Sequence, residues 1–434
     1  MLDIDYIQKN ADAVRKAIEQ KDITLDLDDF LSLDKRRRDL IRNADDLRRK
    51  QNTFNNEIVK LQGEEKQNAI NDMKAVAEDL KKTRSELKDV INRWEKMYAL
   101  IPNIPSNDTP VGSSDAGNIE IAKHGQIPHF DFEAKSHIEL AENLDILDLE
   151  RGVQTSGFRG YYLKGKGALL HLAVLNYALQ KIVENGFTPM ITPTIVKEFA
   201  LFGSGHFPFG QDDIYELSNT GKNEQGGQIE EPLYLSGTSE PALLAYFANS
   251  VIDEKDLPIK VCGYSQCYRN EVGSYGKDTK GLYRIHEFSK VEQVVLCRAD
   301  EKESDRWLLK MRGYAQEVLE DLGLPYRVVQ VCTADMGAGK RKMFDLETWM
   351  PSRKGYGETH SDSDLTDWQT RRLNIKYKSK NGAKKYAFAL NNTVIASPRI
   401  LIAILENNQL KDGSVKIPKP LIKFCGFEII SPQK

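Results

Sequence analysis

The sequence is poor in cysteine, and its few thiols suit neither a metal site nor a disulfide framework. The five cysteines are scattered along 434 residues, and no two of them are separated by only two residues. Cys262 and Cys267 fall within a predicted strand, which indicates buried thiols. We therefore expect reduced cysteines, no zinc site and the reducing environment of the cytoplasm.

Long apolar runs and a strong net charge are absent as well. No segment approaches the roughly 18 apolar residues of a membrane helix, and the opening MLDIDYIQKN lacks the basic and then apolar pattern of a secretory leader. The 61 basic and 64 acidic side chains nearly cancel, so contact with nucleic acid must come from a local patch. The length predicts two or three domains, and we expect no membrane contact.

Proline is absent from residues 31–100, and this stretch has one glycine, Gly63. On each side of this glycine, bulky residues recur at every seventh position and form the apolar seam of a helix. Two such seams joined at a single glycine predict an antiparallel hairpin whose helices are each about 50 Å long. Polar residues in the companion seam predict that the hairpin is narrow and hydrated. The bulky residues that recur at every seventh position are Leu33, Leu40, Leu47, Phe54 and Leu61 in the first seam and Met73, Leu80, Leu87, Trp94 and Ile101 in the second.

The hairpin expected at about 31–100 has two interpretations, a dimerising coiled coil or a probe for a large anionic partner. Residues 61–80, near its tip, carry five acidic and two basic side chains. Phosphate contacts are therefore expected along the two shafts, where basic side chains concentrate. These are Lys35, Arg36, Arg37, Arg38, Arg42, Arg48, Arg49 and Lys50 on one shaft and Lys81, Lys82, Arg84 and Lys88 on the other.

The composition changes after the hairpin. Residues 101–118, IPNIPSNDTPVGSSDAGN, are rich in Pro, Ser and Asn, as is typical of a linker. We place a helical domain at 1–105, a linker at 106–118 and a second domain at 119–434. The second domain is predicted to be α+β, an antiparallel sheet flanked by helices. Its expected elements are a helix at 168–185, with Leu172, Leu175, Leu179 and Ile182 on one face, and strands near 186–196, 232–238, 259–271, 282–296, 327–332 and 386–395.

Two of these strands carry charged groups at a spacing of two. Arg269 and Glu271 in QCYRNE share one face, because side chains alternate along a strand. Phe288, Lys290 and Glu292 do the same in RIHEFSKVE, and a glycine-rich basic loop joins the two segments. Such a face is costly to bury. It suits a ligand that carries phosphates, an amine and a flat base.

Two further segments place polar side chains at the end of a strand. In LYLSGTSEP, Thr238 and Glu240 share a face and suit a small amine, although a Thr-Ser pair before Glu-Pro, taken alone, is more typical of a simple helix cap. In YAFALNNTV, Asn391 and Thr393 share a face in the same way. The pattern at Thr238 and Glu240 does not establish a binding role by itself.

The segment IASPRILIAILEN predicts a helix that Ser397 caps, with Pro398 in its first position and Arg399 next. Its free backbone N–H groups and the guanidinium suit a phosphate. The alternative is an ordinary capped helix with a surface arginine.

The segment GYGETHSDSDLTDW is rich in side-chain oxygen. Such a cluster is compatible with Mg²⁺, which takes one or two protein ligands together with phosphates and water, or with a solvated acidic loop. MGAGKRK at 336–342 is interpreted as a turn, because Ala334 and Arg341 break the phosphate-loop pattern. The polar residues of the oxygen-rich segment are Glu358, His360, Ser361, Asp362, Ser363, Asp364 and Asp367.

Taken together, these segments resemble a known family. GFTPMITPTI, CYRNE with GLYRIHEFSKVE, and IASPRILIAILEN are similar to the three motifs of class II aminoacyl-tRNA synthetases. TSE, ETHSDS and the N-terminal hairpin narrow the resemblance to bacterial-type seryl-tRNA synthetases, in the expected order over nearly the whole chain. It implies a cytoplasmic, homodimeric ligase that joins L-serine to serine tRNA through an adenylate, using ATP and Mg²⁺.

The resemblance also implies a role for each matching position. Arg269, Glu358 and Arg399 would be catalytic, with Arg269 bridging the ATP α-phosphate and the serine carboxylate. Glu271 would bind the adenine amino group, and Phe288 would lie against the adenine. The implied ATP site comprises Arg269, Asn270, Glu271, Ile285, His286, Glu287, Phe288, Glu358, Thr359, His360, Ser361 and Arg399. The implied serine pocket comprises Thr238, Ser239, Glu240, Arg269, Glu292, Asn391 and Thr393, and the implied Mg²⁺ ligands are Glu358 and Ser361.

The same resemblance makes 1–105 a tRNA-binding domain, whose hairpin grips the long variable arm of serine tRNA, and 119–434 the catalytic domain. Pro193 falls where the family forms its dimer interface. The chain departs from the family at Asp362 and Asp364, where Cys and Asn are common. We expect both carboxylates to face water rather than to strengthen the metal site.

Two other functions are considered. A related ligase that charges a carrier protein would not need the long hairpin. A non-catalytic scaffold that binds a helical partner would not need the charged groups that this chain retains, namely Arg269, Glu271, Glu358 and Arg399.

Overall fold

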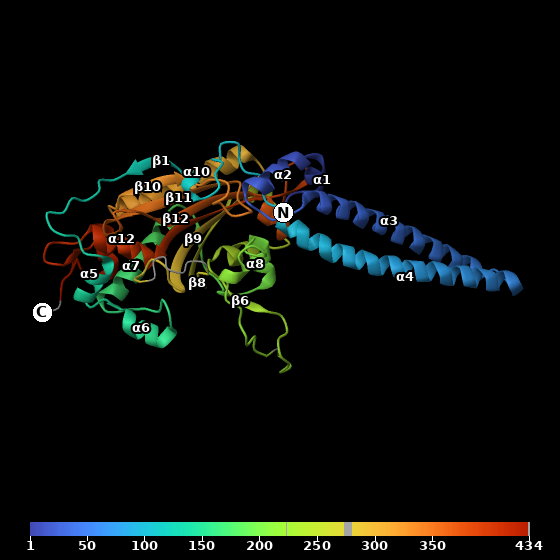
Figure 1. Cartoon of the computed structure of the whole chain (residues 1–434), viewed down its shortest axis with the longest axis horizontal. Coiled ribbons are helices and arrows are strands. Elements are labelled where there is room, and N and C mark those ends of the chain that lie inside the picture. The colour runs from blue at the N-terminus through green and yellow to red at the C-terminus, as the bar shows by residue number, and fades with distance from the viewer. Residues whose placement is uncertain (223, 273–279, 433–434) are drawn as a thin grey trace. The chain divides into compact units, whose positions relative to one another are not determined.

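The computed structural model describes residues 1–222, 224–272 and 280–432 (Figure 1). The chain forms two compact units, Leu2–Pro102 and Asn103–Lys434, and Met1 belongs to the second. Within the described ranges, no helix has the length and apolar character needed to cross a membrane.

The first unit consists of two short helices and a long helical hairpin. Asp26 begins the hairpin by accepting hydrogen bonds from the N–H groups of Asp28 and Asp29. Gly63 begins the returning helix with a φ of 60°, which glycine adopts without steric cost. The predicted hairpin is confirmed. The helices are α1 (Ile4–Lys9), α2 (Ala11–Gln20), α3 (Leu27–Ile58) and α4 (Gly63–Leu100).

The base of the hairpin is packed more tightly than its tip. Phe30 stacks on Trp94 with ring centroids 6.1 Å apart, and Trp94 contacts Tyr98 at 4.7 Å. Leu40 and Leu80 are the last fully buried residues of the two seams, and the seam positions nearer the tip are only partly buried. This gradient agrees with the expected narrow and hydrated hairpin.

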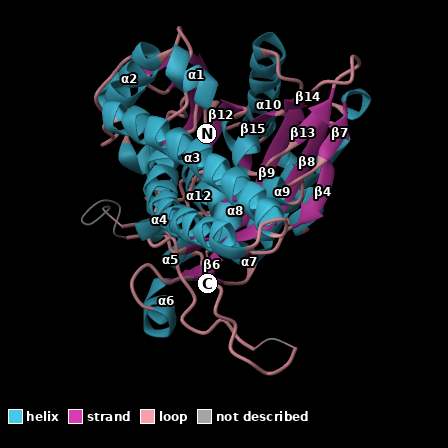
Figure 2. Cartoon of the chain, turned by 90° about the vertical axis from the view of Figure 1, so that its right-hand side faces the viewer, coloured by secondary structure: helices cyan, strands magenta, loops and turns pink. Residues whose placement is uncertain are grey.

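The second unit is built on one large sheet. In the described residues, eight strands pair in the order β1-β10-β11-β12-β15-β9-β8-β4, all antiparallel except the pair β8–β4 at one edge. Figure 2 shows the part of this sheet from β12 to β4. The predicted antiparallel α+β fold is therefore confirmed. The strands are β1 (Ile119–His124), β4 (Thr188–Ile191), β8 (Ile259–Tyr268), β9 (Glu287–Cys297), β10 (Tyr326–Gln330), β11 (Lys342–Met350), β12 (Gly355–Thr366) and β15 (Phe388–Ser397).

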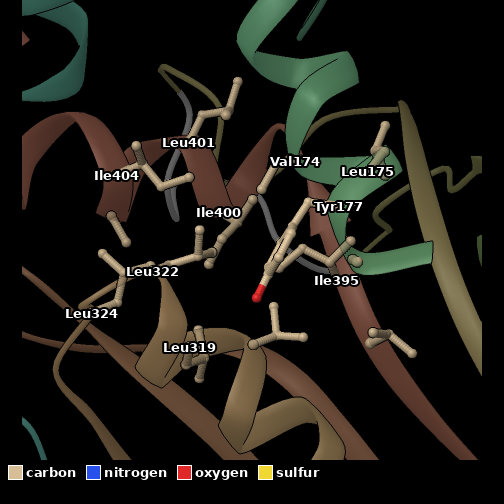
Figure 3. Packing of buried hydrophobic residues seen from close by; sticks show 14 of the residues in the cluster. Val174, Leu175, Tyr177, Leu319, Leu322, Leu324, Ile395, Ile400, Leu401 and Ile404 are labelled. Carbon is tan, nitrogen blue, oxygen red and sulfur yellow. The ribbon is translucent and has the colours of Figure 1, made fainter. Parts of the chain in front are cut away.

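Helices α7, α10 and α12 build the main core against this sheet. Figure 3 shows Val174 of α7, Leu319 of α10, Ile395 of β15 and Ile400 of α12 converging, and all four are buried. A smaller cluster, which includes Leu243 of α9, covers part of the opposite face. The helices of this unit are α5 (His137–Asn143), α6 (Leu149–Ser156), α7 (Lys166–Glu184), α8 (Glu198–Ser204), α9 (Glu240–Ala245), α10 (Glu301–Asp321), α11 (Trp368–Arg372), α12 (Arg399–Asn407) and α13 (Lys419–Cys425).

Short strands and 3₁₀ turns complete the unit. The strands are β2 (Leu147–Asp148), β3 (Tyr162–Leu163), β5 (Ile195–Lys197), β6 (Leu233–Leu235), β7 (Val251–Asp253), β13 (Lys376–Lys378), β14 (Lys384–Tyr386), β16 (Val415–Lys416) and β17 (Ile429–Ile430). The 3₁₀ turns are η1 (Asp115–Gly117), η2 (Gln211–Asp213), η3 (Glu254–Asp256) and η4 (Pro351–Arg353).

Two local expectations were wrong, one of two open alternatives is excluded, and one strand was not predicted. β8 ends at Tyr268, so Arg269 and Glu271 lie beyond the strand, and Glu271 adopts a φ of 54°. The oxygen-rich segment is the strand β12 rather than a loop, and β11 beside it had not been expected. Leu172 on α7 is 49% exposed, because the buried stripe of this helix runs through its neighbours instead.

The ends of two elements also differ from the expectation. Ser397 is the last residue of β15 rather than a helix cap, and Pro398 precedes α12. The Ser397 hydroxyl instead lies 2.8 Å from Nδ1 of His171. At the start of α9, Oγ1 of Thr238 accepts a weak hydrogen bond of 3.4 Å from the N–H of Glu240. Ser239 is the N-cap residue of α9 and its side chain makes no capping hydrogen bond, so the predicted helix cap is not formed by this pair, and Thr238 lines the cavity.

Candidate active site

A cavity of about 380 Å³ lies on the face of the sheet opposite α7 and α10. Alternation along β9 explains its position. Phe288, Lys290 and Glu292 line the cavity, whereas Val291 and Val295 point the other way into the main core. Strands β12 and β15, the starts of α9, α11 and α12, the residues that follow β8, and loop residues within 204–210, 282–285 and 337–340 form the remaining walls.

One corner of the cavity combines a guanidinium, a ring and a carboxylate. The Arg269 guanidinium lies 5.3 Å from the centroid of the Phe288 ring, and its Nε donates to the carbonyl of Gly237 at 3.4 Å. Glu271 forms a 2.9 Å ion pair with Arg284. This corner suits a flat base with an exocyclic amine next to an anionic group.

Arg399 is held by two backbone carbonyls. Its Nε donates to Tyr283 and its Nη1 to Glu358, both at 3.0 Å. The Tyr283 ring contacts two guanidinium groups, that of Arg399 at 4.5 Å and that of Arg353 at 4.2 Å from its centroid. A guanidinium fixed in this way presents a planar set of donors, which is the geometry that phosphates require.

The opposite end of the cavity contains a buried carboxylate. Glu240 begins α9 and accepts hydrogen bonds from the side-chain amides of Gln369, at 2.6 Å, and Asn391. Burial raises the pKa of Glu240, while Gln369, Lys340 and Lys290 act in the opposite direction. A small ammonium ion would supply the positive charge that this site favours.

A second buried carboxylate lies beside the first. Glu292 forms an ion pair of 2.5 Å with Lys290 and accepts a hydrogen bond of 3.3 Å from Oγ1 of Thr393. Burial raises the pKa of Glu292, which Lys290 counteracts, and the negative charge of Glu240 raises it further. The hydroxyl of Thr393 and these two carboxylates can recognise a ligand that carries both an amine and a hydroxyl group.

Three oxygen-bearing side chains meet at the junction of β11 and β12. Asp345 is paired in register with Ser361, and Glu358 lies on the same strand as Ser361. Oδ1 of Asp345 is buried without a hydrogen-bond partner, and burial and the charge of Glu358 raise the pKa of Asp345 well above its usual value. These oxygens fit a hard divalent cation. Among the described residues, no three or more His, Cys, Asp or Glu side chains cluster closely enough to bind a metal ion without further ligands.

Most of the predicted site residues line this one cavity, and five do not. Ser239 and His360 are buried behind the lining, and Nε2 of His360 lies 2.9 Å from a backbone carbonyl. The side-chain amide of Asn270 donates to a backbone carbonyl at 3.2 Å. His286 is partly buried with aromatic edges beside it, and Glu287 is exposed. Cavity residues are Thr238, Glu240, Arg269, Glu271, Ile285, Phe288, Glu292, Glu358, Thr359, Ser361, Asn391, Thr393 and Arg399.

The expectation that Asp362 and Asp364 face water was wrong. Alternation along β12 turns both away from the cavity, toward α10, and both are buried. Asp364 forms an ion pair of 2.9 Å with Arg341, which also pairs with Asp305 at 2.9 Å. Burial raises the pKa of both carboxylates, and Arg312 opposes this at Asp362 as Arg341 does at Asp364. These acids therefore belong to the core side of the sheet.

The sequence interpretation missed four contributors to the site. Lys340 lines the cavity from the segment interpreted as a mere turn, and Tyr283 lies beneath Arg399. Asp345 and Gln369 come from a strand and a helix that had not been predicted. No local sequence pattern singles out Asp345 or Gln369.

Comparisons with known proteins agree with this geometry. Residues 1–105 match the seryl-tRNA synthetase N-terminal domain, and residues 223–408 match the tRNA synthetase class II core domain (G, H, P, S and T). A serine–tRNA ligase of Deinococcus radiodurans is 41% identical over 98% of each chain. One from Treponema denticola is 38% identical over 99% of this chain and 100% of its own.

Solved structures give the same result. The seryl-tRNA synthetase of Pyrococcus horikoshii, complexed with ATP, covers both chains completely at a TM-score of 0.90 and 34% identity. The cytoplasmic serine–tRNA ligase of Naegleria fowleri, in complex with AMP, has a TM-score of 0.83 and 29% identity over 99% of this chain and 97% of its own. The two family models match residues 1–105 and 223–408, and the relatives and solved structures span at least 98% of the chain, so the chain belongs to the seryl-tRNA synthetase family, with a class II catalytic core.

Proposed function

We propose that this serine–tRNA ligase carries out both half-reactions with the cavity described above. L-serine and ATP form seryl-adenylate and pyrophosphate, and the terminal ribose hydroxyl of serine tRNA then attacks the adenylate and releases AMP. The observation that carries the proposal is the clustering, in one cavity, of Arg269 and Arg399 with the buried Glu240 and Glu292. The two arginines suit the phosphates of ATP, and the two buried glutamates suit the amine and hydroxyl of serine.

Adenylate formation joins two anions, because the serine carboxylate attacks the α-phosphorus in line and pyrophosphate leaves. The site therefore needs fixed positive charge more than a general base. Arg269, which lies against the Phe288 ring and whose charge acts on the buried Glu292, neutralises the attacking carboxylate and the α-phosphate. Arg399, held by Tyr283 and Glu358, stabilises the departing phosphates.

Adenine recognition is assigned to the corner next to Arg269. The Phe288 ring supplies a face for the base, and Glu271 accepts a hydrogen bond from its amino group. Ile285 and Thr359 line the same cavity. Asn270, His286, Glu287, His360 and Ser239 keep their predicted roles only as hypotheses, since they lie outside the lining.

Serine specificity is assigned to the carboxylate end. Glu240 and Asn391 receive the ammonium group, and Glu292 with Thr393 receives the hydroxyl. Alanine would leave these buried polar groups unpaired, which disfavours its binding.

Magnesium is assigned to the junction of β11 and β12. Glu358 and Ser361 would hold the ion, and the unpaired Oδ1 of Asp345 supports a divalent cation there. The ion supplies positive charge to the phosphates of ATP when it is bound.

Three assignments concern the rest of the molecule. The hairpin α3–α4 binds the long variable arm of serine tRNA through the basic residues of its shafts. A homodimer forms at the edge of the sheet around β4. Pro193 lies two residues beyond Ile191, the last residue of β4, and the Ile191 side chain is 89% exposed. The location is the cytoplasm, where the five free cysteines of the structure stay reduced.

Pyrophosphate exchange over the twenty amino acids tests the proposal. Exchange of labelled pyrophosphate into ATP should require serine and Mg²⁺ and should fall by about a thousandfold or more in Arg269→Ala, because a transition-state donor is lost. The exposed Arg151→Ala is the matched control. Exchange with another amino acid alone, or with none, would contradict the assignment.

A further inference from the structure

One carboxylate outside the cavity ties three parts of the fold together. Glu406, near the end of α12, is fully buried. It accepts hydrogen bonds from the N–H and hydroxyl of Ser352, at 2.9 and 2.7 Å, and from the N–H and ring Nδ1 of His137, both at 2.9 Å. Burial acts to raise the pKa of Glu406, but these donors outweigh it and lower the pKa. Glu406 is thus an ionised anchor.

The other ring nitrogen of His137 reaches the cavity wall. The N–H of Leu282 donates to Nε2 of His137 at 3.3 Å, and Leu282 lines the cavity. The preceding Gly281 has a φ of 80°, and a Cβ at this position would lie 2.3 Å from Nε2. The contact between ring and backbone therefore depends on glycine here.

These contacts define the proton position on the ring. Because the Leu282 N–H points at Nε2, this nitrogen must be the acceptor, and Nδ1 must carry the proton that is donated to Glu406. The ring is therefore neutral and has one orientation. If both ring nitrogens carried a proton, the Nε2–H of His137 and the backbone N–H of Leu282 would point at each other, and neither could accept a hydrogen bond.

The link returns to the phosphate end of the site. Tyr283 follows Leu282, and both its carbonyl and its ring contact Arg399. Arg399 begins α12, and Glu406 lies on the same helix about two turns later. Ser352, the other partner of Glu406, precedes Arg353, whose guanidinium also contacts the Tyr283 ring. The buried carboxylate of Glu406 therefore supports Leu282 through His137 and Arg353 through Ser352, and Tyr283 adjoins both Leu282 and Arg353.

We propose that His137 is a positioning residue for ATP, which holds Leu282 and Tyr283 so that Arg399 presents its donors to the nucleotide. This inference rests on the proposed function, since it takes Arg399 to bind the phosphates of ATP. His137 does not line the cavity, and its effect passes through the backbone of 282–283. Loss of the His137 side chain leaves the buried N–H of Leu282 without its acceptor, and Tyr283 and Arg399 are then held less firmly at the end of the cavity assigned to the phosphates. The serine end is built from other elements and should not respond.

Two substitutions separate the halves of the link. In His137→Asn, the side-chain amide can replace Nδ1 and donate to Glu406, but it cannot reach Leu282. In His137→Gln, the longer side chain can place its oxygen near Nε2 and accept from Leu282. The matched control is His129→Asn, which makes the same change at an exposed histidine.

The KM values for ATP and for serine are measured by pyrophosphate exchange, and the Kd for ATP without serine by calorimetry. In His137→Asn, we expect the KM and Kd for ATP to rise about tenfold, with the KM for serine unchanged within about twofold. His137→Gln should recover most of the ATP affinity, and His129→Asn should equal the wild type.

Three results would overturn the proposal: an unchanged Kd for ATP in His137→Asn, a parallel rise of both KM values, or a Gln variant no better than the Asn variant. Thermal unfolding of each variant shows whether loss of stability accounts for a parallel rise. A wild type that binds ATP without serine-dependent exchange would instead refute the proposed function, and the calorimetric comparison would still decide the role of His137.

Discussion

The two compact units of this chain are stabilised by different kinds of contact. In the hairpin, one turn brings α3 and α4 together in a regular register, and partly exposed ion pairs such as Arg36–Glu86 and Asp29–Arg93 follow it. In the second unit, strands far apart in sequence pair, and the charged residues that line the cavity come from α9, β9, β12, α12 and the loops after β8 and before β11. Repetitive local contacts give length, and non-local contacts fix the positions of reactive groups. Changes in the hairpin should therefore affect the aminoacylation of tRNA, and changes in the cavity should affect adenylate formation.

A loss as large as that predicted for Arg269→Ala is expected at the carboxylate end of the cavity. Glu240→Gln removes the charge that faces the serine ammonium, so kcat/KM for serine should fall by about a thousandfold, with the KM for ATP little changed. Exchange kinetics with varied serine and varied ATP measure both. Equal losses for the two substrates would show that the two ends of the cavity are not independent.

Shortening the hairpin tests the opposite side of the comparison. The pairs Arg36–Glu86 and Asp29–Arg93 place residue 45 opposite residue 77, so residues 45–77 can be replaced by a short glycine linker that keeps the packed base. Aminoacylation of serine tRNA should fall by about a hundredfold as phosphate contacts are lost, while exchange persists. Intact charging would show that the hairpin has a structural role alone.

Within the hairpin, stability should follow the burial gradient. Leu40→Ala should lower the free energy of unfolding by about 3 kcal/mol, because its side chain is buried at the base. Leu61→Ala, near the tip, should cost less than about 1 kcal/mol. Urea unfolding followed by circular dichroism compares the two. Similar losses would mean that the tip is as well packed as the base.

The smallest effect is expected from the acid turned away from the cavity. Asp364→Asn should change the free energy of unfolding by about 1 kcal/mol or less, because Arg341 keeps Asp305 and Glu301 as partners. The Mg²⁺ dependence of exchange should stay the same, since Asp364 faces α10. Arg341→Ala is the matched change and should cost about 3 kcal/mol by leaving Asp364 buried and unpaired. A shifted Mg²⁺ optimum in Asp364→Asn would place the carboxylate at the metal site after all.

The periodic and alternating parts of the chain could be predicted from the sequence. The seven-residue repeat around Gly63 identified the hairpin, and the spacing of two in β9 placed Phe288, Lys290 and Glu292 on one face. The prediction failed for Arg269 and Glu271, which the fold places beyond the end of β8, and for Asp362 and Asp364. For the latter pair, the acidic composition suggested water, while pairing with β11 and β15 determined which face is buried.

By itself, the sequence determined the helical hairpin, the alternation along β9 and which chemical groups are available, because hydrophobic period and local turn residues act over a few positions. Only the tertiary structure decided which groups meet. The approach of Asp345 to Ser361, of Gln369 to Glu240 and of His137 to Leu282 joins segments that no local pattern connects. The physical reason is that side-chain direction and burial depend on strand pairing and helix docking between distant parts of the chain.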